Sequence, residues 1–357
     1  MSKDYNILVI NPGSTSTKVA LYRNEQVLFD KKIEHKSEEL LKYPNIIDQY
    51  EFRLNIILNF LEEKRVHHSL LDAVVGRGGL LKPISSGTYR VNNNMLVDLR
   101  RGISGQHASN LGALLAYGIA EKISVPAYIV DPVVVDEMKP IAKISGMTDI
   151  PRISIFHTLN QKAIARKAAI DLGIKYEHAN FIIAHLGGGI SVGIHSKGKV
   201  IDVNNALNGE GPFSPERSGG VPIGALVELC FSGKFTKDEI MKKIKGNGGL
   251  VGYLQTNDMR EVIKRIENGD KKTKMILEAM AYQVSKEIGA GSTVLKGKID
   301  AIILTGGIAY ADAFINLIKD RISFLSLVMV YAGEEEMLAL SEGALRVLKG
   351  EEVEKIY

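Results

Sequence analysis

The feature that most constrains the fold is an internal repeat of extended segments joined by turns. Near the N-terminus, the apolar run YNILVI leads into a turn, and the extended segments VALYR and VLFDKKI follow it. The segment FIIAHLGGGISVGIHSKGKVIDV (residues 181–203) repeats this order of strand, glycine turn, strand, tight polar turn and strand. Apolar and alternating runs bounded by turn residues are typical of strands. Both copies are therefore predicted to be three-stranded meanders.

The elements after each meander also recur. A helical stretch from about Ser37 to Arg65, the strand DAVV, another helix and the strand AYIVD follow the first copy. A helix over residues 273–295, the strand DAIILT and the turn GGIAYAD follow the second. One glycine turn can recur by chance in any α/β protein, so the matching order over both halves carries the prediction. It predicts an α/β fold of two duplicated domains, each with a mixed five-stranded sheet flanked by helices.

The length of the chain agrees with two domains, because 357 residues exceed what one hydrophobic core usually supports. The boundary is placed in the loop-like segment DEMKPIAKISGMTDIP. The first domain is predicted to comprise residues 1–135 plus a C-terminal helix at about 338–357. The second is predicted to comprise residues 136–337.

Composition limits which binding partners and which cellular location are expected. The net charge of +4 comes without blocks of Lys or Arg, so no nucleic-acid partner is expected, and a small anionic ligand suffices to explain the excess. No apolar run reaches the length of a membrane helix and the N-terminus lacks a signal-peptide layout, so a cytoplasmic protein without membrane contact is expected. The single cysteine, Cys230 in ALVELCF, excludes an internal disulfide and is predicted to be buried.

The first turn of the repeat, NPGSTSTK (residues 11–18), has the composition of a phosphate site. It is not a P-loop, because no glycine precedes Lys18 and an extended segment follows in place of a helix. Ser14 and Ser16 offer hydroxyl donors and Lys18 offers a charge. Its counterpart offers backbone N–H groups at three glycines after His185, and glycine lets such groups turn toward an anion. The three glycines are Gly187, Gly188 and Gly189.

A third glycine turn, TGGIAYAD, follows a strand and opens a helix, where the helix N-terminus is electropositive. Glycine at such a turn is more often conformational than ligand-binding, but three turns in this order strengthen the signal. The ligand-facing residues predicted here are Gly306, Gly307, Ile308 and Tyr310.

Together these motifs carry a family resemblance. A β-hairpin phosphate loop, its repeat and a glycine pair before a helix resemble the actin, hexokinase and heat-shock-chaperone ATPase superfamily, which implies ribonuclease-H-like domains with an ATP cleft between them. The segments ILVINPGSTSTK, AHLGGGIS, PERSGG and TNDMRE resemble the motifs of the acetokinase family. Within that family, VGRGGLLKPISSGTY, HLGGGISVG and RSGGVP are most similar to the butyrate kinases. The resemblance runs over nearly the whole chain.

The resemblance implies four catalytic residues. Arg77 is expected to bind the substrate carboxylate, and Arg217 is expected to stabilise the transferring phosphoryl group. The planar guanidinium group suits both roles, because its N–H donors match carboxylate and phosphoryl oxygens. His157 is assigned to transition-state stabilisation, and Asp131 to orienting Arg77 or the water shell of the metal. Each also has an ordinary explanation: a structural ion pair for the arginines, a core position for the histidine and an Asp-Pro turn for the aspartate.

The resemblance also implies binding residues for ATP/ADP and Mg²⁺. His185 belongs to the phosphate loop, and the segment TNDMRE places Asp258, Met259 and Arg260 beside the adenosine. Asn11 and one glutamate of the run 334–336 are the candidates for a loosely held Mg²⁺, and Glu335 is the choice among the three.

The function expected from the resemblance is a butyrate kinase, which transfers the ATP γ-phosphoryl group reversibly to a short carboxylate. A homo-oligomer is expected on the same ground. Gly220 stands where acetate kinases carry an acidic residue after R-S-G, which puts acetate as the main substrate in doubt. The alternatives are an acetate or propionate kinase, a sugar or polyol kinase of the same fold with Asp131 as base, and a nucleotide-driven clamp or regulator.

Overall fold

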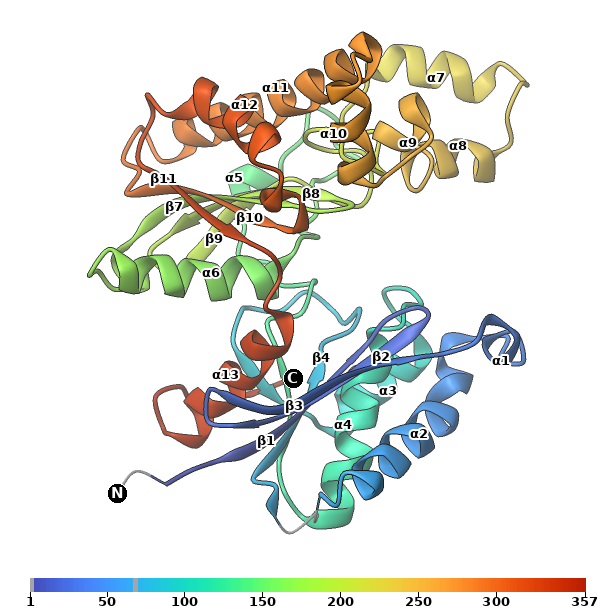
Figure 1. Cartoon of the computed structure of the whole chain (residues 1–357), viewed down its shortest axis with the longest axis vertical. Coiled ribbons are helices and arrows are strands. Elements are labelled where there is room, and N and C mark those ends of the chain that lie inside the picture. Colours follow the sequence, from blue (N-terminus) through green and yellow to red (C-terminus); the bar gives the residue numbers. More distant parts are fainter. Residues whose placement is uncertain (1–2, 67–69) are drawn as a thin grey trace. The chain divides into compact units, whose positions relative to one another are not determined.

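The computed structural model describes residues 3–66 and 70–357 and contains two compact units (Figure 1). Unit 1 consists of Met1–Val135 together with Glu335–Tyr357, and unit 2 consists of Asp136–Glu334. Each unit contains one mixed sheet with helices packed against it.

The sheet of unit 1 has seven strands in the order β12-β5-β6-β4-β1-β2-β3. Antiparallel pairing joins β1 to β2 and β2 to β3, which confirms the first predicted meander. Five strands were predicted, and the short β5 and β12 extend the sheet to seven. The strands are β1 (Asn6–Pro12), β2 (Ser16–Arg23), β3 (Gln26–Glu34), β4 (Ala73–Arg77), β5 (Thr88–Arg90), β6 (Ala127–Val130) and β12 (Lys355–Ile356).

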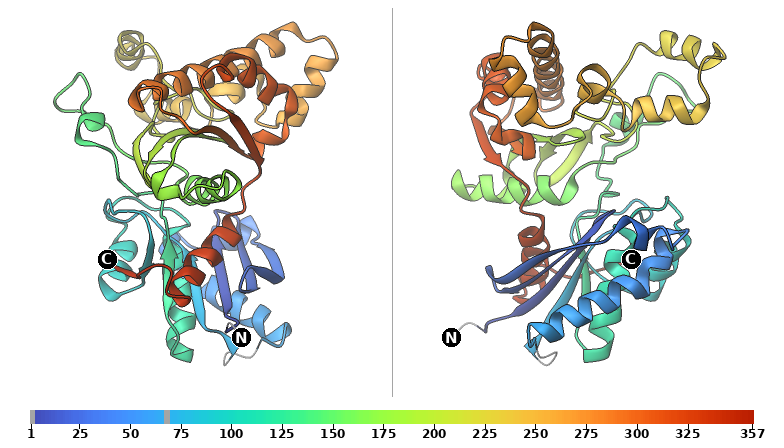
Figure 2. Two further views of the ribbon diagram at one scale, coloured as in Figure 1. Left: turned by 90° about the vertical axis from the view of Figure 1, so that its left-hand side faces the viewer. Right: turned by 45° about the vertical axis from the view of Figure 1, so that its right-hand side comes forward.

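Helices cover both faces of this sheet. In Figure 2, α4 and α13 lie on opposite sides of it, and both contact β1, β4 and β6. The predicted continuous helix from Ser37 to Arg65 is wrong: the chain leaves helical geometry after Leu40 and resumes it near Ile46. Pro44 lies in the gap, and proline disfavours helix at its own position and the one before. The helices of unit 1 are α1 (Ser37–Leu40), η1 (Ile46–Gln49), α2 (Tyr50–Glu63), α3 (Asn93–Arg101), α4 (Asn110–Ile123) and α13 (Glu336–Leu348).

The sheet of unit 2 has five strands in the order β11-β10-β7-β8-β9, as predicted. Antiparallel β7–β8 and β8–β9 pairs form the second meander, and parallel pairs join β7 to β10 and β10 to β11. The strands are β7 (Asn180–Leu186), β8 (Ile190–Ser196), β9 (Lys199–Val203), β10 (Ala301–Gly306) and β11 (Val328–Ala332).

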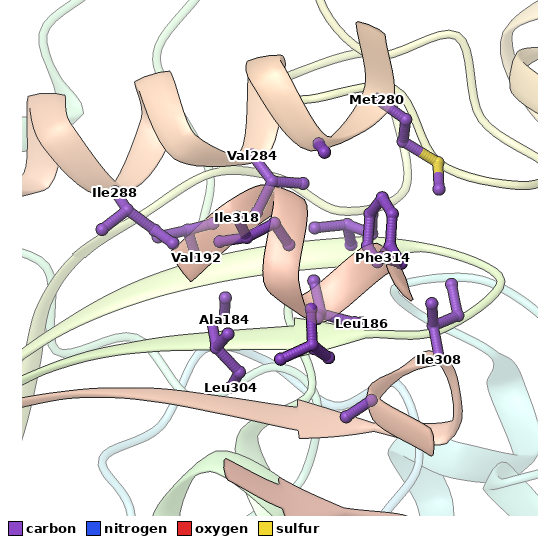
Figure 3. Packing of buried hydrophobic residues seen from close by; sticks show 14 of the residues in the cluster. Ala184, Leu186, Val192, Met280, Val284, Ile288, Leu304, Ile308, Phe314 and Ile318 are labelled. Carbon is purple, nitrogen blue, oxygen red and sulfur yellow. The ribbon is translucent and has the colours of Figure 1, made fainter. Parts of the chain in front are cut away.

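The main core of unit 2 lies between this sheet and two helices. Figure 3 shows Met280, Val284 and Ile288 of α11, which recur every four residues and so share one helix face. They pack with Phe314 and Ile318 of α12 over the sheet, and α6 covers the other face (Figure 1). The helices of unit 2 are α5 (Pro140–Lys143), α6 (Thr158–Asp171), η3 (Tyr176–His178), α7 (Ile223–Phe231), α8 (Lys237–Ile244), α9 (Gly249–Leu254), α10 (Met259–Glu267), α11 (Lys271–Val294), η4 (Gly307–Tyr310) and α12 (Asp312–Ile322).

The helix α7 of unit 2 has no buried residue, although it is nine residues long. Although α7 is almost entirely apolar, Ile223 is 71% exposed and Phe231 is 87% exposed. The prediction that Cys230 is buried is wrong for this reason, since its apolar neighbours are themselves on the surface. Among residues 3–66 and 70–357, no helix is long and apolar enough to cross a membrane.

Candidate active site

The first loop is the tight turn between β1 and β2. Asn11 pairs with Lys18 across the two strands, and the backbone N–H of Gly13 donates to the carbonyl of Ser16 at 2.8 Å. Side chains alternate along β2, so Thr17 is buried whereas Lys18 is exposed. Ser14 at the tip is also exposed. The hairpin therefore presents hydroxyls and one ammonium group to solvent.

Beside this turn, three polar side chains meet at the ends of β1, β4 and the start of α13. The Nη1 atom of Arg77 donates to Glu336 Oε2 at 2.7 Å and to Asn11 Oδ1 at 3.4 Å. The amide nitrogen of Asn11 donates to the same Glu336 oxygen at 2.9 Å. Glu336 is therefore the glutamate of the acidic run whose carboxylate joins the Asn11 amide. The choice of Glu335 as the metal ligand stays a prediction.

Asp131 follows β6, whose Val130 pairs with Arg77 in the parallel ladder. Its φ of 39° is in the left-handed region, which residues other than glycine rarely adopt. The Gly87 N–H donates to Asp131 Oδ1 at 2.7 Å, and the Asp131 N–H donates back to the Gly87 carbonyl at 3.1 Å. The buried carboxylate is thus fixed at a strand end next to that of Arg77.

The second loop, Gly187–Gly189, joins β7 to β8 and has two stacked histidines beside it. The rings of His157 and His185 are 3.8 Å apart and nearly parallel, at 11°. His185 Nδ1 lies 2.7 Å from Asn160 Oδ1 and its Nε2 lies 3.0 Å from Glu334 Oε1. His157 Nδ1 lies 2.9 Å from Ser191 Oγ. Each ring is therefore held in orientation by a polar partner on its Nδ1 side.

Arg217 lies against the same loop. A Cβ atom added to Gly189 would be 3.9 Å from His157 Cε1 and 4.0 Å from Arg217 Cγ, so these two side chains flank that glycine. Arg217 Nη1 contacts Glu216 Oε2 at 3.2 Å, and its buried Nε atom has no hydrogen-bond partner among the described residues. An unpartnered guanidinium nitrogen fits a role in contacting an anion.

Most of the predicted nucleotide-binding residues line a pocket of about 1080 Å³ in unit 2. This volume is near the upper end of the usual range for small-molecule sites. Predicted residues that line it are Gly187, Gly188, Asp258, Met259, Arg260, Gly307, Ile308 and Tyr310, and Glu216, Asn257 and Glu334 line it as well. Three predicted nucleotide residues of unit 2, His185, Gly189 and Gly306, do not line this pocket.

Two of the pocket residues form a local ion pair at the N-terminus of α10. Asp258 accepts from the Arg260 backbone N–H at 2.9 Å and from the guanidinium at 2.7 Å. These bonds, the side-chain bond first, lower the pKa of Asp258 to about 2. Arg260 is 92% exposed, so its planar guanidinium, paired with Asp258, is accessible from the pocket.

Sequence comparisons identify the family to which this site belongs. The chain is 60% identical over 353 residues to Butyrate kinase 1 of Clostridium acetobutylicum, covering 99% of both chains. Residues 149–352 match the model of the acetokinase family. The chain belongs to the acetokinase family. The predicted resemblance is thereby confirmed, as is the predicted class of enzyme, a kinase with a carboxyl group as acceptor.

Solved structures of acetokinase-type enzymes share this fold. The crystal structure of Porphyromonas gingivalis acetate kinase superposes with a TM-score of 0.79 at 19% identity, covering 96% of this chain and 100% of that one. A propionate kinase from Francisella tularensis gives 0.75 at 22% identity, covering 95% and 98%. At these identities the likeness extends to the fold alone.

The residues of the candidate site include oxygen donors for a metal ion. The described residues contain no group of three His, Cys, Asp or Glu side chains that could hold a metal ion. Mg²⁺, however, commonly takes one or two protein oxygens and completes its shell with water and phosphate. The Asn11 amide oxygen and the Glu336 carboxylate are such hard oxygen donors, and they lie together. The residues fit a loosely held Mg²⁺.

Two polar residues beside the histidines of the candidate site were missed in the sequence. Asn160 and Ser191, which contact the two histidines, occur in the segments HTLNQ and GGGIS. Asn160, in α6, contacts His185 of β7 and not the nearby His157, so its spacing in the sequence gives no signal of this partner. Ser191 lies in β8, and nothing local to it indicates a histidine partner.

Proposed function

We propose that the protein is a butyrate kinase, which reversibly transfers the γ-phosphoryl group of ATP to butyrate or a related short or branched-chain fatty acid. The products are butyryl phosphate and ADP. The observation that carries the proposal is the 60% identity to Butyrate kinase 1 of Clostridium acetobutylicum across 99% of both chains. Two arginines in glycine-containing segments, Arg77 in GRGG and Arg217 in ERSGG, support it.

The chemistry requires charge neutralisation more than proton transfer. A carboxylate oxygen attacks the γ-phosphorus in line, the bond from that phosphorus to the β,γ-bridging oxygen breaks, and ADP keeps the electron pair. The carboxylate is already ionised at neutral pH, so no general base has to remove a proton. The protein must instead position the two anions and stabilise charge on the three equatorial phosphoryl oxygens.

Arg77 is the proposed carboxylate-binding residue. Both of its contacts with Asn11 and Glu336 use Nη1, so the rest of the guanidinium fork remains for substrate oxygens. Glu336 fixes the plane of that fork from the protein side. Mg²⁺, held through Asn11 and Glu336, would neutralise phosphate charge when bound.

His157 and Arg217 are the proposed stabilisers of the transferring group. Both flank Gly189, and each presents a nitrogen donor at the end of the second loop. Ser191 Oγ, 2.9 Å from His157 Nδ1, holds the imidazole ring in orientation. ATP would place its adenosine in the pocket beside Asp258, Met259 and Arg260.

A carboxylate panel tests the proposal. Purified protein with ATP and Mg²⁺ is given acetate, propionate, butyrate, isobutyrate and valerate, and acyl phosphate is trapped with hydroxylamine. We expect the highest kcat/KM for butyrate or isobutyrate, and no ADP release with glucose or glycerol. A panel without any trappable acyl phosphate would refute the assignment, and a maximum at acetate would replace butyrate by acetate.

We also propose a homo-oligomeric, cytoplasmic enzyme, as expected from the family. The exposed apolar side chains of α7, among them Ile223, Val227 and Phe231, support self-association, because monomers rarely expose such a patch. Light scattering on the wild type and on Phe231→Glu measures it. A monomeric wild-type protein at working concentration would contradict the proposed assembly.

A further inference from the structure

A fully buried guanidinium lies beneath the first phosphate loop. Arg53, from α2, has no exposed surface. Its Nη1 atom donates to the carbonyl oxygens of Gly13 at 2.8 Å and Ser16 at 3.1 Å, and to Thr17 Oγ1 at 3.1 Å. Its Nη2 atom donates to the carbonyl oxygen of Ser14 at 3.1 Å. One side chain therefore holds three carbonyl groups of the loop from the inside.

The bonds of Arg53 determine where the loop's N–H groups point. In a planar trans peptide, the C=O of one residue and the N–H of the next point in opposite directions. With the Gly13 and Ser14 carbonyls turned inward, the N–H groups of Ser14 and Thr15 turn outward. Within the described chain, neither of these N–H groups donates to a protein acceptor. Two adjacent free N–H groups of this kind form an anion-binding concavity.

The charge of Arg53 is not balanced by any carboxylate in the described chain. Its remaining contacts are to the neutral amide oxygen of Gln49, at 2.8 Å from Nη2 and 3.1 Å from Nε. Burial lowers its pKa to about 10, which leaves it charged at neutral pH. A buried unpaired cation is costly, and an arriving anion removes part of that cost.

The neighbouring histidine does not add a second charge. His35 Nε2 lies 2.8 Å from Thr17 Oγ1, the hydroxyl that also accepts from Arg53. Burial, followed by the charge of Arg53, lowers the pKa of His35 to about 4. The imidazole is therefore neutral under working conditions, and Arg53 is the cation of this cluster.

We propose that Arg53 is a positioning residue for the phosphoryl group of ATP: it turns the loop's N–H groups outward and supplies a buried positive charge that the phosphate offsets. It acts through the loop backbone and does not touch the ligand. This inference rests on the proposed function only in naming ATP as the source of the phosphoryl group. A purely structural role for Arg53 is the competing explanation.

Three variants separate the charge from the geometry. Gln49→Glu gives Arg53 a carboxylate partner of the same shape, which neutralises the charge while keeping the bonds to the loop. Arg53→Lys keeps the charge but loses the planar fork that holds several carbonyls at once. Arg53→Met loses both. Gln26→Glu, an exposed change of the same chemistry in β3, is the matched control.

The experiment measures Kd for ATP and for adenosine by calorimetry without any carboxylate, followed by kcat and KM. We expect Gln49→Glu to weaken ATP binding about tenfold, with adenosine binding unchanged and thermal stability retained or raised because Arg53 gains a carboxylate partner. Arg53→Lys should lower kcat about 10²-fold through misplacement of the loop, and Gln26→Glu should change nothing. If Arg53→Met does not fold, the other two variants decide.

The possible failures are distinguishable. An unchanged ratio of ATP to adenosine affinity in Gln49→Glu together with an unchanged kcat in Arg53→Lys would leave Arg53 a structural residue and overturn the inference. The proposed function would stand in that case. Conversely, a wild type that prefers ATP over adenosine but forms no acyl phosphate would refute the function and leave the inference standing.

Discussion

The two hairpin loops have the same strand order but opposite electrostatic surroundings. The turn after β1 contains Lys18 and is held from below by the buried cation of Arg53. The turn after β7 is held by neutral donors, since Ser214 Oγ donates to the Gly188 carbonyl at 2.6 Å and the Glu216 N–H donates to the same oxygen at 3.2 Å. A Cβ on Gly188 would be 3.4 Å from the Glu216 carboxylate.

The difference shows that the duplication repeats a backbone and not a binding site. Loop 1 (Gly13–Thr15) attracts an anion through charge, and loop 2 (Gly187–Gly189) offers backbone N–H groups close to two carboxylates, Glu216 and Glu334. An anion beside those carboxylates needs additional cations, which Arg217 and the nearby histidines can supply. The loops are therefore expected to respond differently to the same kind of substitution.

The largest expected effect is on catalysis, and it should differ between variants of Arg77 and Arg217. Arg77→Ala should raise the KM for butyrate and lower kcat/KM about 10³-fold, because the carboxylate loses its guanidinium. Arg217→Ala should lower kcat about 10²-fold with both KM values unchanged, because its contact strengthens only in the transition state. Steady-state kinetics on both variants measure the split, and Arg90→Ala, on the surface of β5, is the control. The same pattern in both variants would erase the functional difference between the units.

Replacing a glycine by alanine should destabilise unit 2 at Gly306 much more than unit 1 at Gly13. Gly306, at the end of β10, has φ 94° and ψ 173°, and a Cβ there would lie 2.4 Å from the Leu186 carbonyl oxygen next to loop 2. Gly306→Ala should lower the free energy of unfolding by about 3 kcal/mol. Gly13→Ala in loop 1 meets nothing nearer than 3.5 Å and should cost under about 0.5 kcal/mol.

Urea unfolding of both variants measures this contrast. Gly307→Ala is the local control, since no atom lies within 4 Å of a Cβ at that position. Equal losses for Gly13→Ala and Gly306→Ala would contradict this contrast and would mean that loop 1 tolerates a Cβ atom no better than the position of Gly306 does.

Local patterns predicted the regular elements of this fold well. Apolar alternation gave both meanders, and the amphipathic stretch at 273–295 corresponds to α11, Lys271–Val294. The strands β5 and β12 could not be found in this way, because each has at most three residues and depends on a partner distant in the sequence. The exposure of Cys230 was also beyond local reasoning, since an apolar helix left on the surface of its unit contradicts the usual rule.

For the site, motifs predicted residues that lie together within each unit but not the residues that hold them. Arg53 is 36 to 40 residues away from the loop atoms that it binds, and no spacing rule connects a buried helix position to a hairpin. Glu336 joins Asn11 across 325 residues. The acidic run at 334–336 was recognised in the sequence. Only the packing at the start of α13 shows that Glu336 contacts Asn11 and Arg77. Supporting contacts of this kind arise from tertiary structure.

The buried histidine under loop 1 predicts a pH dependence. Burial lowers the pKa of His35 to about 4 in the folded chain, against 6.5 when it is exposed. Between these values the unfolded chain binds a proton that the folded chain does not. The free energy of unfolding should therefore fall by about 2 kcal/mol as the pH is lowered from 6.5 to 4. Denaturation curves across this range, compared with His35→Gln, isolate the contribution.

The matched control for this dependence is His178→Gln, since His178 is exposed in unit 2. His178→Gln should retain the wild-type dependence of the unfolding free energy on pH. His35→Gln should reduce that dependence by an amount equivalent to at most one bound proton. A slope that is unchanged in His35→Gln would show that His35 is not the group responsible. In that case, the neutral state of His35 beside Arg53 would lose its support.

The smallest expected effect concerns the neutral support of loop 2. Ser214→Ala removes the hydroxyl that donates to the Gly188 carbonyl, but the Glu216 N–H continues to bind that oxygen, so no buried acceptor is left without a partner. The loss should be about 1 kcal/mol in stability, with kcat reduced by less than about tenfold. Thermal unfolding and kinetics on one preparation measure both. A loss of kcat as large as that expected for Arg53→Lys would mean that loop 2 is positioned as strictly as loop 1. The contrast between a loop held by a buried cation and a loop held by neutral, redundant donors would then not extend to function.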